Sequence, residues 1–234
     1  MDSVISSIHR CLLIVAAPKE VQAVLDAFDA PANQSPIPGQ PVQLDDRFDL
    51  VPSGVGKSLA AAATSRCCTL NTYRSVISVG IAGSLPSSNP IRIGQSIAAT
   101  RSVFSDEGIG SPEGFTPISE LGFAPFPTGT MHINHDPELL ALLESITDAL
   151  GTIATVSWCS GDDGCAQGVV HRTGAIAEAM EGAACAAAVQ MIDPTIRTGE
   201  LRVISNTTGN RADQVWNLDL ALMNLTKVLG RLRR

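Results

Sequence analysis

The sequence predicts an α/β fold in which a central, largely parallel sheet carries helices on both faces. Apolar runs typical of buried strands alternate with helical patterns along the chain. The runs CLLIVAA (11–17) and SVISVGIAG (75–83) are almost continuously apolar, as expected of strands covered on both faces. The chain shows no internal repeat and no linker that divides it, so we expect one domain over residues 1–234.

The first half of the chain predicts a regular alternation of strands and helices. Pro18 stands at a favourable first helical position, directly after the first apolar run. A segment rich in Pro and Gln predicts a loop, and an alanine-rich pattern predicts the second helix. The expected elements are strand 11–17, helix 18–28, loop 30–41, strand 48–53, helix 57–69, strand 75–83 and strand 95–104.

The second half begins with residues 105–131, which are rich in Gly, Pro and Phe and which we expect to form a long functional or mobile loop. Its Phe115, Phe123 and Phe126 could cover a bound aromatic group. Asp136 is a suitable N-cap for the amphipathic pattern that follows it. The expected elements are helix 136–150, strand 152–161, strand 175–180, helix 181–192, strand 200–209 and helix 214–232.

The composition describes a compact protein and excludes several classes of partner. Hydrophobic residues make up 44% of the chain and charged residues 17%, which is typical of a globular domain. The formal net charge is −7, whereas a nucleic-acid surface needs a basic stripe, so we expect no nucleic-acid partner. No apolar run reaches the roughly 18 residues of a membrane span. No signal peptide is evident either, so we expect no membrane association and a cytoplasmic location.

The cysteines and a short histidine motif are candidates for redox or metal chemistry. No two of the six cysteines have C-x-x-C spacing, and we expect them to be small apolar residues of a reduced core. His132 and His135 form H-x-x-H, which is weak evidence for a metal outside a helix. The segment SGDDG (160–164) is too short for a calcium loop and is typical of a turn. We therefore expect no metal and no cofactor.

The segment LVPSGVGKSLAAAAT (50–64) is similar to a phosphate-binding loop. A Walker A loop has the pattern G-x-x-x-x-G-K-[ST], which would place its first glycine at the position of Val51. Pro52 beside it lacks the backbone donor that a phosphate cradle needs. We therefore interpret the segment as a strand-to-helix turn, whose glycines let a ligand approach the backbone closely.

Chemically distinctive residues lie just past several of the expected strands. Ligands of such sheets bind at the carboxyl ends of the strands, so these residues are candidates for one common site. They are Glu20, the turn 53–57, the segment Gly80–Ser84, Met180 with Glu181, and Ser205 with Asn206.

Five segments, in order, resemble the nucleoside phosphorylase and nucleosidase superfamily. Each segment is weak alone, but the ordered set is specific and spans nearly the whole chain. The resemblance implies a three-layer α/β fold with a mixed, twisted central sheet, a small-molecule nucleoside substrate and a homo-oligomer. The segments are AAPKEVQAVL (16–25), SGVGKSLAAA (53–62), SVGIAGSL (78–85), EAMEGAACAAAV (178–189) and RVISNTTGNRADQVW (202–216).

Within that superfamily the sequence is most similar to the futalosine hydrolase branch. The similarity lies in the turn Gly80–Gly83, in Met180–Ala183, and in Asn206 with Arg211 behind it. It implies hydrolysis of the N-glycosidic bond of a 6-oxopurine nucleoside. Futalosine would give hypoxanthine and dehypoxanthine futalosine, a step of menaquinone biosynthesis.

Three alternative functions stay open. The methylthioadenosine/S-adenosylhomocysteine nucleosidases are similar at Glu20, but they carry Asp at the position of Asn206 and Ser at the position of Ile81. Those departures count against an adenine nucleoside. A purine nucleoside phosphorylase needs several basic residues around phosphate, and Lys57 alone is weak support. A binding protein that lost catalysis has no need of Glu20.

The resemblance also implies roles for two carboxylates and a methionine. Glu181 begins a helix, where the dipole favours a carboxylate, and would accept hydrogen bonds from the ribose 2′- and 3′-hydroxyls. Met180 would pack against the sugar, and Glu20 would hold and deprotonate the attacking water. Without the resemblance, Glu181 would be interpreted as a helix cap, Met180 as a core side chain and Glu20 as a carboxylate of a first helical turn.

The base and the 5′ substituent are assigned to polar residues near the chain's end. Asn206 would hold hypoxanthine, because an amide offers the base both a donor and an acceptor; a turn residue is the alternative. Arg211 is the candidate for the aromatic carboxylate that futalosine carries beyond its 5′ carbon. Arg101 is the alternative, and an ion pair of Arg211 with Asp213 would be a purely structural role.

Three further residues complete the expected pocket. Ala82 and Gly83 lie at the end of strand 75–83, where a ligand can approach the chain closely. Val55 lies in the glycine turn at the pocket rim, and we expect it to face the sugar.

Overall fold

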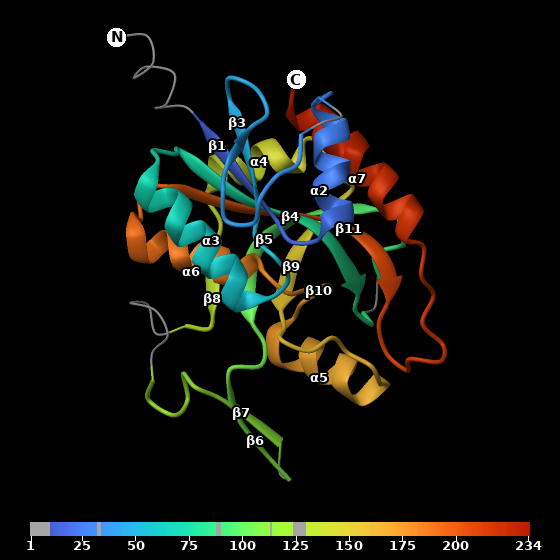
Figure 1. Ribbon diagram of the computed structural model, residues 1–234. Coiled ribbons are helices and arrows are strands. Elements are labelled where there is room, and N and C mark those ends of the chain that lie inside the picture. The colour runs from blue at the N-terminus through green and yellow to red at the C-terminus, as the bar shows by residue number, and fades with distance from the viewer. Residues whose placement is uncertain (1–9, 32–33, 88–89, 113, 124–129) are drawn as a thin grey trace.

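The computed structural model describes residues 10–31, 34–87, 90–112, 114–123 and 130–234, and its elements alternate as predicted (Figure 1). The strands are β1 (Cys11–Val15), β2 (Val42–Gln43), β3 (Phe48–Pro52), β4 (Ser75–Ser84), β5 (Ser96–Phe104), β6 (Gly108–Ser111), β7 (Gly114–Pro117), β8 (His132–Asn134), β9 (Ala149–Thr155), β10 (Ala177–Ala179) and β11 (Arg197–Thr207). The helices are α2 (Pro18–Ala27), α3 (Lys57–Leu70), α4 (Pro137–Glu144), α5 (Asp163–Thr173), α6 (Gly182–Ile192) and α7 (Leu218–Leu232).

A nine-stranded mixed sheet forms the centre of the described structure. Its order is β10-β9-β5-β11-β4-β1-β3-β2, with β8 paired to β5. The four strands β1, β3, β4 and β11 run parallel, so their carboxyl ends meet at one edge, whereas β5 is antiparallel to β11. The mixed sheet confirms the fold class, and this common edge is where such sheets bind ligands.

The sheet closes on itself at the short strand β10. This strand is parallel to β9 on one side and antiparallel to β4 on the other, with Ala177 opposite Ser84 and Glu178 opposite Gly83. Because β10 runs against β4, the chain that follows it returns alongside β4. The closure therefore brings the start of α6 to the edge where β1, β4 and β11 end.

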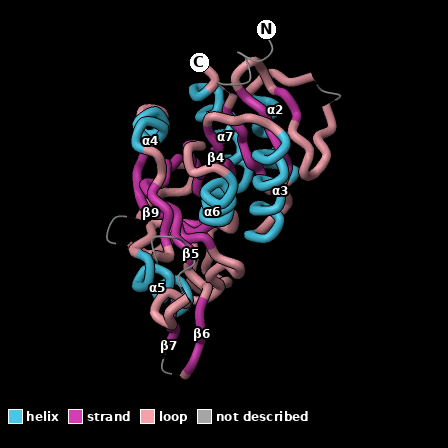
Figure 2. Tube along the Cα trace, turned by 90° about the vertical axis from the view of Figure 1, so that its left-hand side faces the viewer, coloured by secondary structure: helices cyan, strands magenta, loops and turns pink. Residues whose placement is uncertain are grey.

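Helices cover both faces of the sheet. On one face α2 packs against α7, and α4 joins them in the largest apolar cluster of the protein. On the other face α3 and α6 lie side by side, as both views show (Figures 1 and 2). Within the part of the chain that the structure describes, no helix combines the length and apolar character needed to cross a membrane.

Two elements extend from the lower end of the sheet in Figure 1, and the sequence predicted neither. The expected loop 105–131 contains a hairpin in which β6 and β7 pair antiparallel. The expected turn 160–164 is the start of α5. Asp162 caps this helix by accepting a hydrogen bond from the Cys165 amide at 2.8 Å, and Gly174 ends it in the left-handed conformation at φ 65°.

The helix expected over 136–150 is shorter than predicted. Asp136 caps α4 as expected, because its side chain accepts hydrogen bonds from the backbone amides of the first turn. The helix nevertheless ends at Glu144, and the Thr147 hydroxyl donates to the Leu143 carbonyl at 2.9 Å. Ala149 already belongs to β9, so apolar residues of a strand extended the helical pattern in the sequence.

The cysteines divide into two groups. Cys159 is exposed and Cys165 is half-buried, so the expectation that all six are core residues was wrong for these two. Both lie around the start of α5, the helix that the sequence pattern did not predict. The free thiols that are buried, as expected, are Cys11, Cys67, Cys68 and Cys185.

Candidate active site

A cavity of about 200 Å³ lies at the carboxyl edge of the sheet, where β1, β4 and β11 end and α6 begins. Segments far apart in the sequence form its walls, which also include Cys159, Glu178 and Trp216. Arg211 is the only one of the eight expected site residues outside its lining. The seven that line it are Glu20, Val55, Ala82, Gly83, Met180, Glu181 and Asn206.

Glu20 is fixed between the first and fourth strands of the sequence. The residue is 5% exposed, and its carboxylate accepts hydrogen bonds from the Ala17 amide at Oε2 and from the Ile81 amide at Oε1, both at 2.8 Å. Burial raises the pKa of Glu20, and the Arg202 guanidinium and these two amides counteract only part of that rise. The result is a buried carboxylate with a fixed orientation and an increased affinity for a proton.

Glu181 occupies the N-cap position of α6, directly after the strand closure. Its Oε1 accepts a hydrogen bond from the Gly56 amide at 3.0 Å, and its Oε2 lies 3.3 Å from Arg202 Nη1. Gly56 has φ 98°, a left-handed conformation that glycine adopts readily. The glycine turn that is similar to a phosphate loop therefore holds a carboxylate of this pocket.

Arg202 links the carboxylates beneath the pocket, and the sequence analysis did not identify it. The side chain is fully buried in β11, and its Nη2 donates to Ser78 Oγ at 2.7 Å. Burial alone would lower its pKa, but the carboxylates of Glu200, Glu181 and Glu20 outweigh burial and raise it. Arg202 is therefore a permanent cation that these carboxylates share.

Gly80 provides the space in which these groups meet. A Cβ atom at this position would lie 2.5 Å from Glu20 Oε1 and 2.7 Å from Arg202 Nη1. Any side chain at residue 80 would therefore displace the carboxylate, the guanidinium or both.

Asn206 lines the same pocket, after a register shift that interrupts the pairing of β11 with β4. Its Oδ1 accepts from Ser205 Oγ at 2.7 Å, and its Nδ2 donates to the Thr207 carbonyl at 2.9 Å. These two bonds fix the amide and leave one N–H free to donate.

Glu178 is a third buried carboxylate of the pocket lining, and the sequence analysis did not single it out. It lies opposite Gly83 in the strand closure, and its two oxygens accept from the Ser160 amide at 2.8 Å and from Ser160 Oγ at 2.6 Å. Burial raises its pKa, and the bonds from Ser160 oppose that rise. Glu178 thereby attaches the segment before α5 to the pocket wall.

Comparisons with known proteins show the family to which the chain belongs. The model of the phosphorylase superfamily matches residues 12–234. The futalosine hydrolase of Streptomyces coelicolor is 34% identical over 229 residues, which cover 94% of each chain. The chain belongs to the futalosine hydrolase family of the phosphorylase superfamily.

Solved structures share the fold of this family member. The futalosine hydrolase mutant of Helicobacter pylori superposes with a TM-score of 0.76 at 20% identity, covering 97% of this chain and 99% of that one. A 5′-methylthioadenosine/S-adenosyl homocysteine nucleosidase from Helicobacter pylori, solved with a substituted pyrrolidin-3-ol, gives the same TM-score, identity and coverage. The fold is therefore common to both activities, and only residues of the site can separate them.

Arg211 lies beside the pocket rather than in it. Its guanidinium is 5.8 Å from the ring of Trp216, which lines the pocket. Asp213, its expected ion-pair partner, instead accepts a hydrogen bond from Asn210 Nδ2 at 2.7 Å. Arg101, the alternative for the 5′ carboxylate, donates to Thr152 Oγ1 at 3.0 Å within the sheet.

Lys57 and the histidine motif have structural partners. Lys57 Nζ pairs with Asp106 and, at 3.4 Å, with Glu107, so its charge is already compensated. His135 is buried against Ser102 and Thr198, and burial lowers its pKa to about 4. Among the described residues no group of three or more His, Cys, Asp or Glu side chains is arranged to hold a metal ion.

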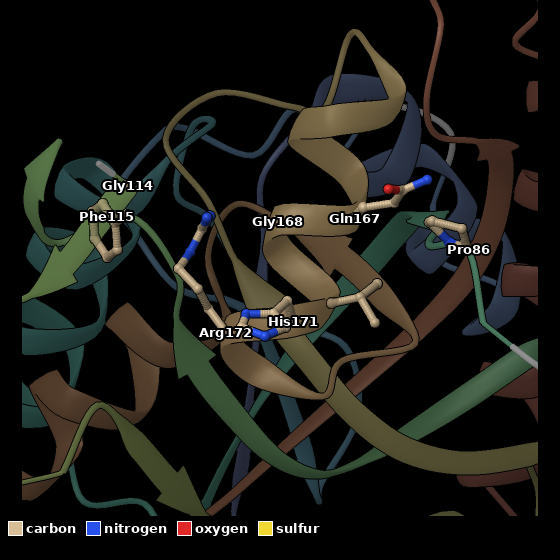
Figure 3. A pocket seen from close by; sticks show the side chains of 8 residues that line it. Pro86, Gly114, Phe115, Gln167, Gly168, His171 and Arg172 are labelled. Atoms are coloured by element: carbon tan, nitrogen blue, oxygen red, sulfur yellow. The ribbon is translucent and has the colours of Figure 1, made fainter. Parts of the chain in front are cut away.

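A larger cavity of about 740 Å³ lies away from this pocket, between α5 and the hairpin (Figure 3). Phe115 faces the Arg172 guanidinium, which lies 4.8 Å from the centre of its ring. Phe115 therefore lines this groove and does not cover the pocket, as the sequence analysis had expected it to do. Phe123 is 69% exposed, and Phe126 lies outside the described residues.

Proposed function

We propose that the protein hydrolyses the N-glycosidic bond of a 6-oxopurine nucleoside and that futalosine is its substrate. The observation that carries the proposal is the arrangement of Glu20 and Glu181 around the buried Arg202, in a pocket that Asn206 also lines. Membership of the futalosine hydrolase family supports the same substrate. Hydrolysis would release hypoxanthine and dehypoxanthine futalosine.

Glu20 is the proposed general base. Its two backbone hydrogen bonds fix the carboxylate, and its raised pKa makes it a stronger base than an exposed Glu. The water oxygen would form a bond to the anomeric carbon while the bond from that carbon to hypoxanthine breaks. One water proton would pass to Glu20.

Glu181 is the proposed ribose ligand. Its carboxylate is held by Gly56 and Arg202, and its remaining lone pairs can accept hydrogen bonds from the 2′- and 3′-hydroxyls. Its negative charge also lies close to the positive charge that develops on the ribosyl group. Met180 and Val55 would enclose the sugar, since both line the pocket.

Asn206 is the proposed ligand of the departing hypoxanthine. The N–H that its internal hydrogen bonds leave free would donate to an acceptor of the base and stabilise the negative charge that forms there. An amide cannot deliver a proton, so the departing hypoxanthine would take one from solvent. The proton that Glu20 receives from the attacking water is the other half of this exchange, so the number of protons balances. Ala82 and Gly83 would form the wall beside the base.

Arg211 and Trp216 are the proposed contacts of the 5′ substituent. Trp216 offers an aromatic face in the pocket, and Arg211 offers a guanidinium next to it. This pair suits an aromatic group that carries a carboxylate. The assignment separates futalosine from inosine, which has no such substituent.

We also propose that the enzyme works as a homo-oligomer of single-domain subunits, in the cytoplasm, in menaquinone biosynthesis and without a cofactor. The described cysteines are free thiols, as in a reducing compartment. Exposed apolar side chains on α3 and α6, which include Leu59 at 54% and Met191 at 78%, support an interface between subunits there.

The test is release of free base from three nucleosides, with and without phosphate. The pure protein is incubated with futalosine, inosine and methylthioadenosine, and hypoxanthine and adenine are measured. We expect hypoxanthine from futalosine in the absence of phosphate. Adenine release would favour a methylthioadenosine nucleosidase, strict dependence on phosphate a phosphorylase, and no release a binding protein; each of these results would contradict the proposal.

A further inference from the structure

A second layer of buried polar side chains lies beneath the pocket. Glu200 is fully buried in β11, and its Oε1 accepts a hydrogen bond from Arg202 Nε at 2.9 Å. Its Oε2 accepts from Ser102 Oγ on β5. Ser102 Oγ lies 2.8 Å from His135 Nε2, and His135 Nδ1 lies 3.3 Å from Thr198 Oγ1. A continuous chain of contacts therefore runs from Glu181 through Arg202 to His135.

The hydrogen-bond pattern determines the state of His135. A serine hydroxyl has one proton, and Ser102 gives it to Glu200, so Ser102 must accept from His135 Nε2–H. Because burial lowers the pKa of His135 to about 4, the ring is neutral near pH 7. The neutral ring then carries its proton on Nε2, and Nδ1 is free to accept from Thr198.

This layer has no direct access to substrate. Glu200, Ser102 and His135 are 0%, 0% and 6% exposed, and the lining of the pocket includes none of them. A Cβ at Gly182 would collide with the Glu200 carboxylate, so the first residue of α6 closes over it. Glu200 therefore makes no contact with the pocket itself, and the charged group through which it can act there is Arg202.

The charges around Glu20 show what that effect would be. The facing cation is Arg202 from β11, and the facing carboxylate is Glu181 at the start of α6. Arg202 also pairs with Glu200, and this carboxylate compensates part of the positive charge that acts on Glu20. Removing the Glu200 charge would leave Arg202 more strongly attracted to the other two carboxylates.

We propose that Glu200, supported by Ser102 and His135, is a positioning residue that sets the orientation and the effective charge of Arg202 toward Glu20 and Glu181. The inference rests on the function proposed above. It assigns a task to buried groups that make no contact with the pocket, and it makes the proton affinity of the general base depend on a residue of the second layer.

The test is Glu200→Gln, which keeps the shape of the side chain and removes its charge. We expect the acidic limb of the pH profile of kcat/KM to move down by about one pH unit, because the cation beside Glu20 becomes less compensated. We expect kcat to fall about tenfold, since Glu20 becomes a weaker base, with KM changed less than about threefold.

The control is Asp148→Asn, which also neutralises a hydrogen-bonded carboxylate, here an exposed one. Asp148 accepts hydrogen bonds from the Ser96 amide at 2.8 Å and from Ser96 Oγ at 2.7 Å, outside the pocket lining. This variant should lower the Tm and leave the pH profile in place. If Glu200→Gln does not fold, Ser102→Ala should give a smaller shift of the acidic limb in the opposite direction, because Glu200 keeps its charge, loses the serine hydroxyl and attracts Arg202 more strongly.

A second readout separates this inference from the proposed function. The titration of Glu20 is followed by ¹³C NMR of carboxyl-labelled protein, with the resonance identified in Glu20→Gln. A lower titration midpoint in Glu200→Gln, or a higher one in Ser102→Ala, supports the inference even if no nucleoside is hydrolysed. An unchanged midpoint and an unchanged acidic limb, with only the Tm reduced, would overturn it.

Discussion

The pocket around Glu20 and the groove beside α5 are both cavities, but they differ in how their charges are held. The pocket measures about 200 Å³ and the groove about 740 Å³. In the pocket, Glu20 and Glu181 are buried and fixed by backbone amides and by Arg202. In the groove, Arg172 lies over Phe115 and donates to the Ser105 carbonyl at 3.2 Å.

The difference shows that volume is a poor guide to the site in this protein. Glycosidic hydrolysis needs a base for water and negative charge near the ribosyl cation. The pocket offers fixed carboxylates for both tasks. The described residues that line the groove include the cationic Arg172 but no carboxylate, so the larger cavity lacks the groups that the reaction requires.

Glu20→Gln, a substitution in the pocket, should reduce kcat more than any of the substitutions that follow. The amide keeps the shape of the side chain but cannot accept a proton, so we expect kcat to fall about a thousandfold while substrate binding is retained. Initial rates of hypoxanthine release and calorimetric binding of futalosine measure the two quantities.

The pH dependence provides the control for this substitution. Glu20 must be ionised to act as a base, so wild-type activity should be lost as the pH falls through the raised pKa of Glu20. The residual activity of the Gln variant should lack that limb. Full activity in the variant would show that another group activates the water.

Gly80→Ala should have the next largest effect, although it changes no chemical group of the site. The new methyl would lie 2.5 Å from Glu20 Oε1 and must displace it, so we expect kcat/KM to fall about a hundredfold. Gly110→Ala in β6 is the matched control, because a Cβ there meets no atom within 4 Å. Equal activities of the two variants would mean that the position of Glu20 is not critical.

Arg211→Met should affect only substrates with a charged 5′ substituent. Without the guanidinium we expect the KM for futalosine to rise about tenfold while the kinetics with inosine are unchanged, since inosine has no carboxylate to bind. Parallel Michaelis–Menten curves for the two nucleosides measure this. An equal loss for both would assign Arg211 a structural role beside Trp216.

Arg172→Met should have the smallest effect. The substitution removes the cation of the groove and its contact with Phe115, and we expect kcat/KM to change less than about twofold. The assay is the same hypoxanthine release. A loss comparable to that of Glu20→Gln would place the reaction near the groove and reverse the contrast between the two cavities.

The site residues whose positions depend on local sequence were predictable. Glu20 lies just past β1 and Asn206 near the end of β11, and their positions at one edge follow from the parallel order of those strands. Glu181 follows an apolar run that is also visible in the sequence, but it reaches this edge because β10 closes the sheet antiparallel to β4. The Asp136 cap and the alternation of elements were predictable for the same reason. Their chemical roles came from the family resemblance, and they stay predictions.

Residues that depend on pairing between distant strands were not predictable. Arg202 interrupts the apolar run LRVIS, and this was the available signal, but its partners Ser78 and Glu181 lie on another strand and at the start of α6. Glu178 reaches the pocket only because β10 closes the sheet against β4. The hairpin β6–β7 escaped prediction because its strands are short, exposed or half-buried, and contain glycines, so no apolar pattern marks them.

The most direct test of where the chemistry occurs is a crystal structure of the Glu20→Gln variant with futalosine bound. We expect the nucleoside in the pocket, with its ribose hydroxyls on Glu181 and its hypoxanthine beside Asn206. A nucleoside bound in the groove between α5 and β6–β7, with the pocket empty, would contradict the assignment of the site.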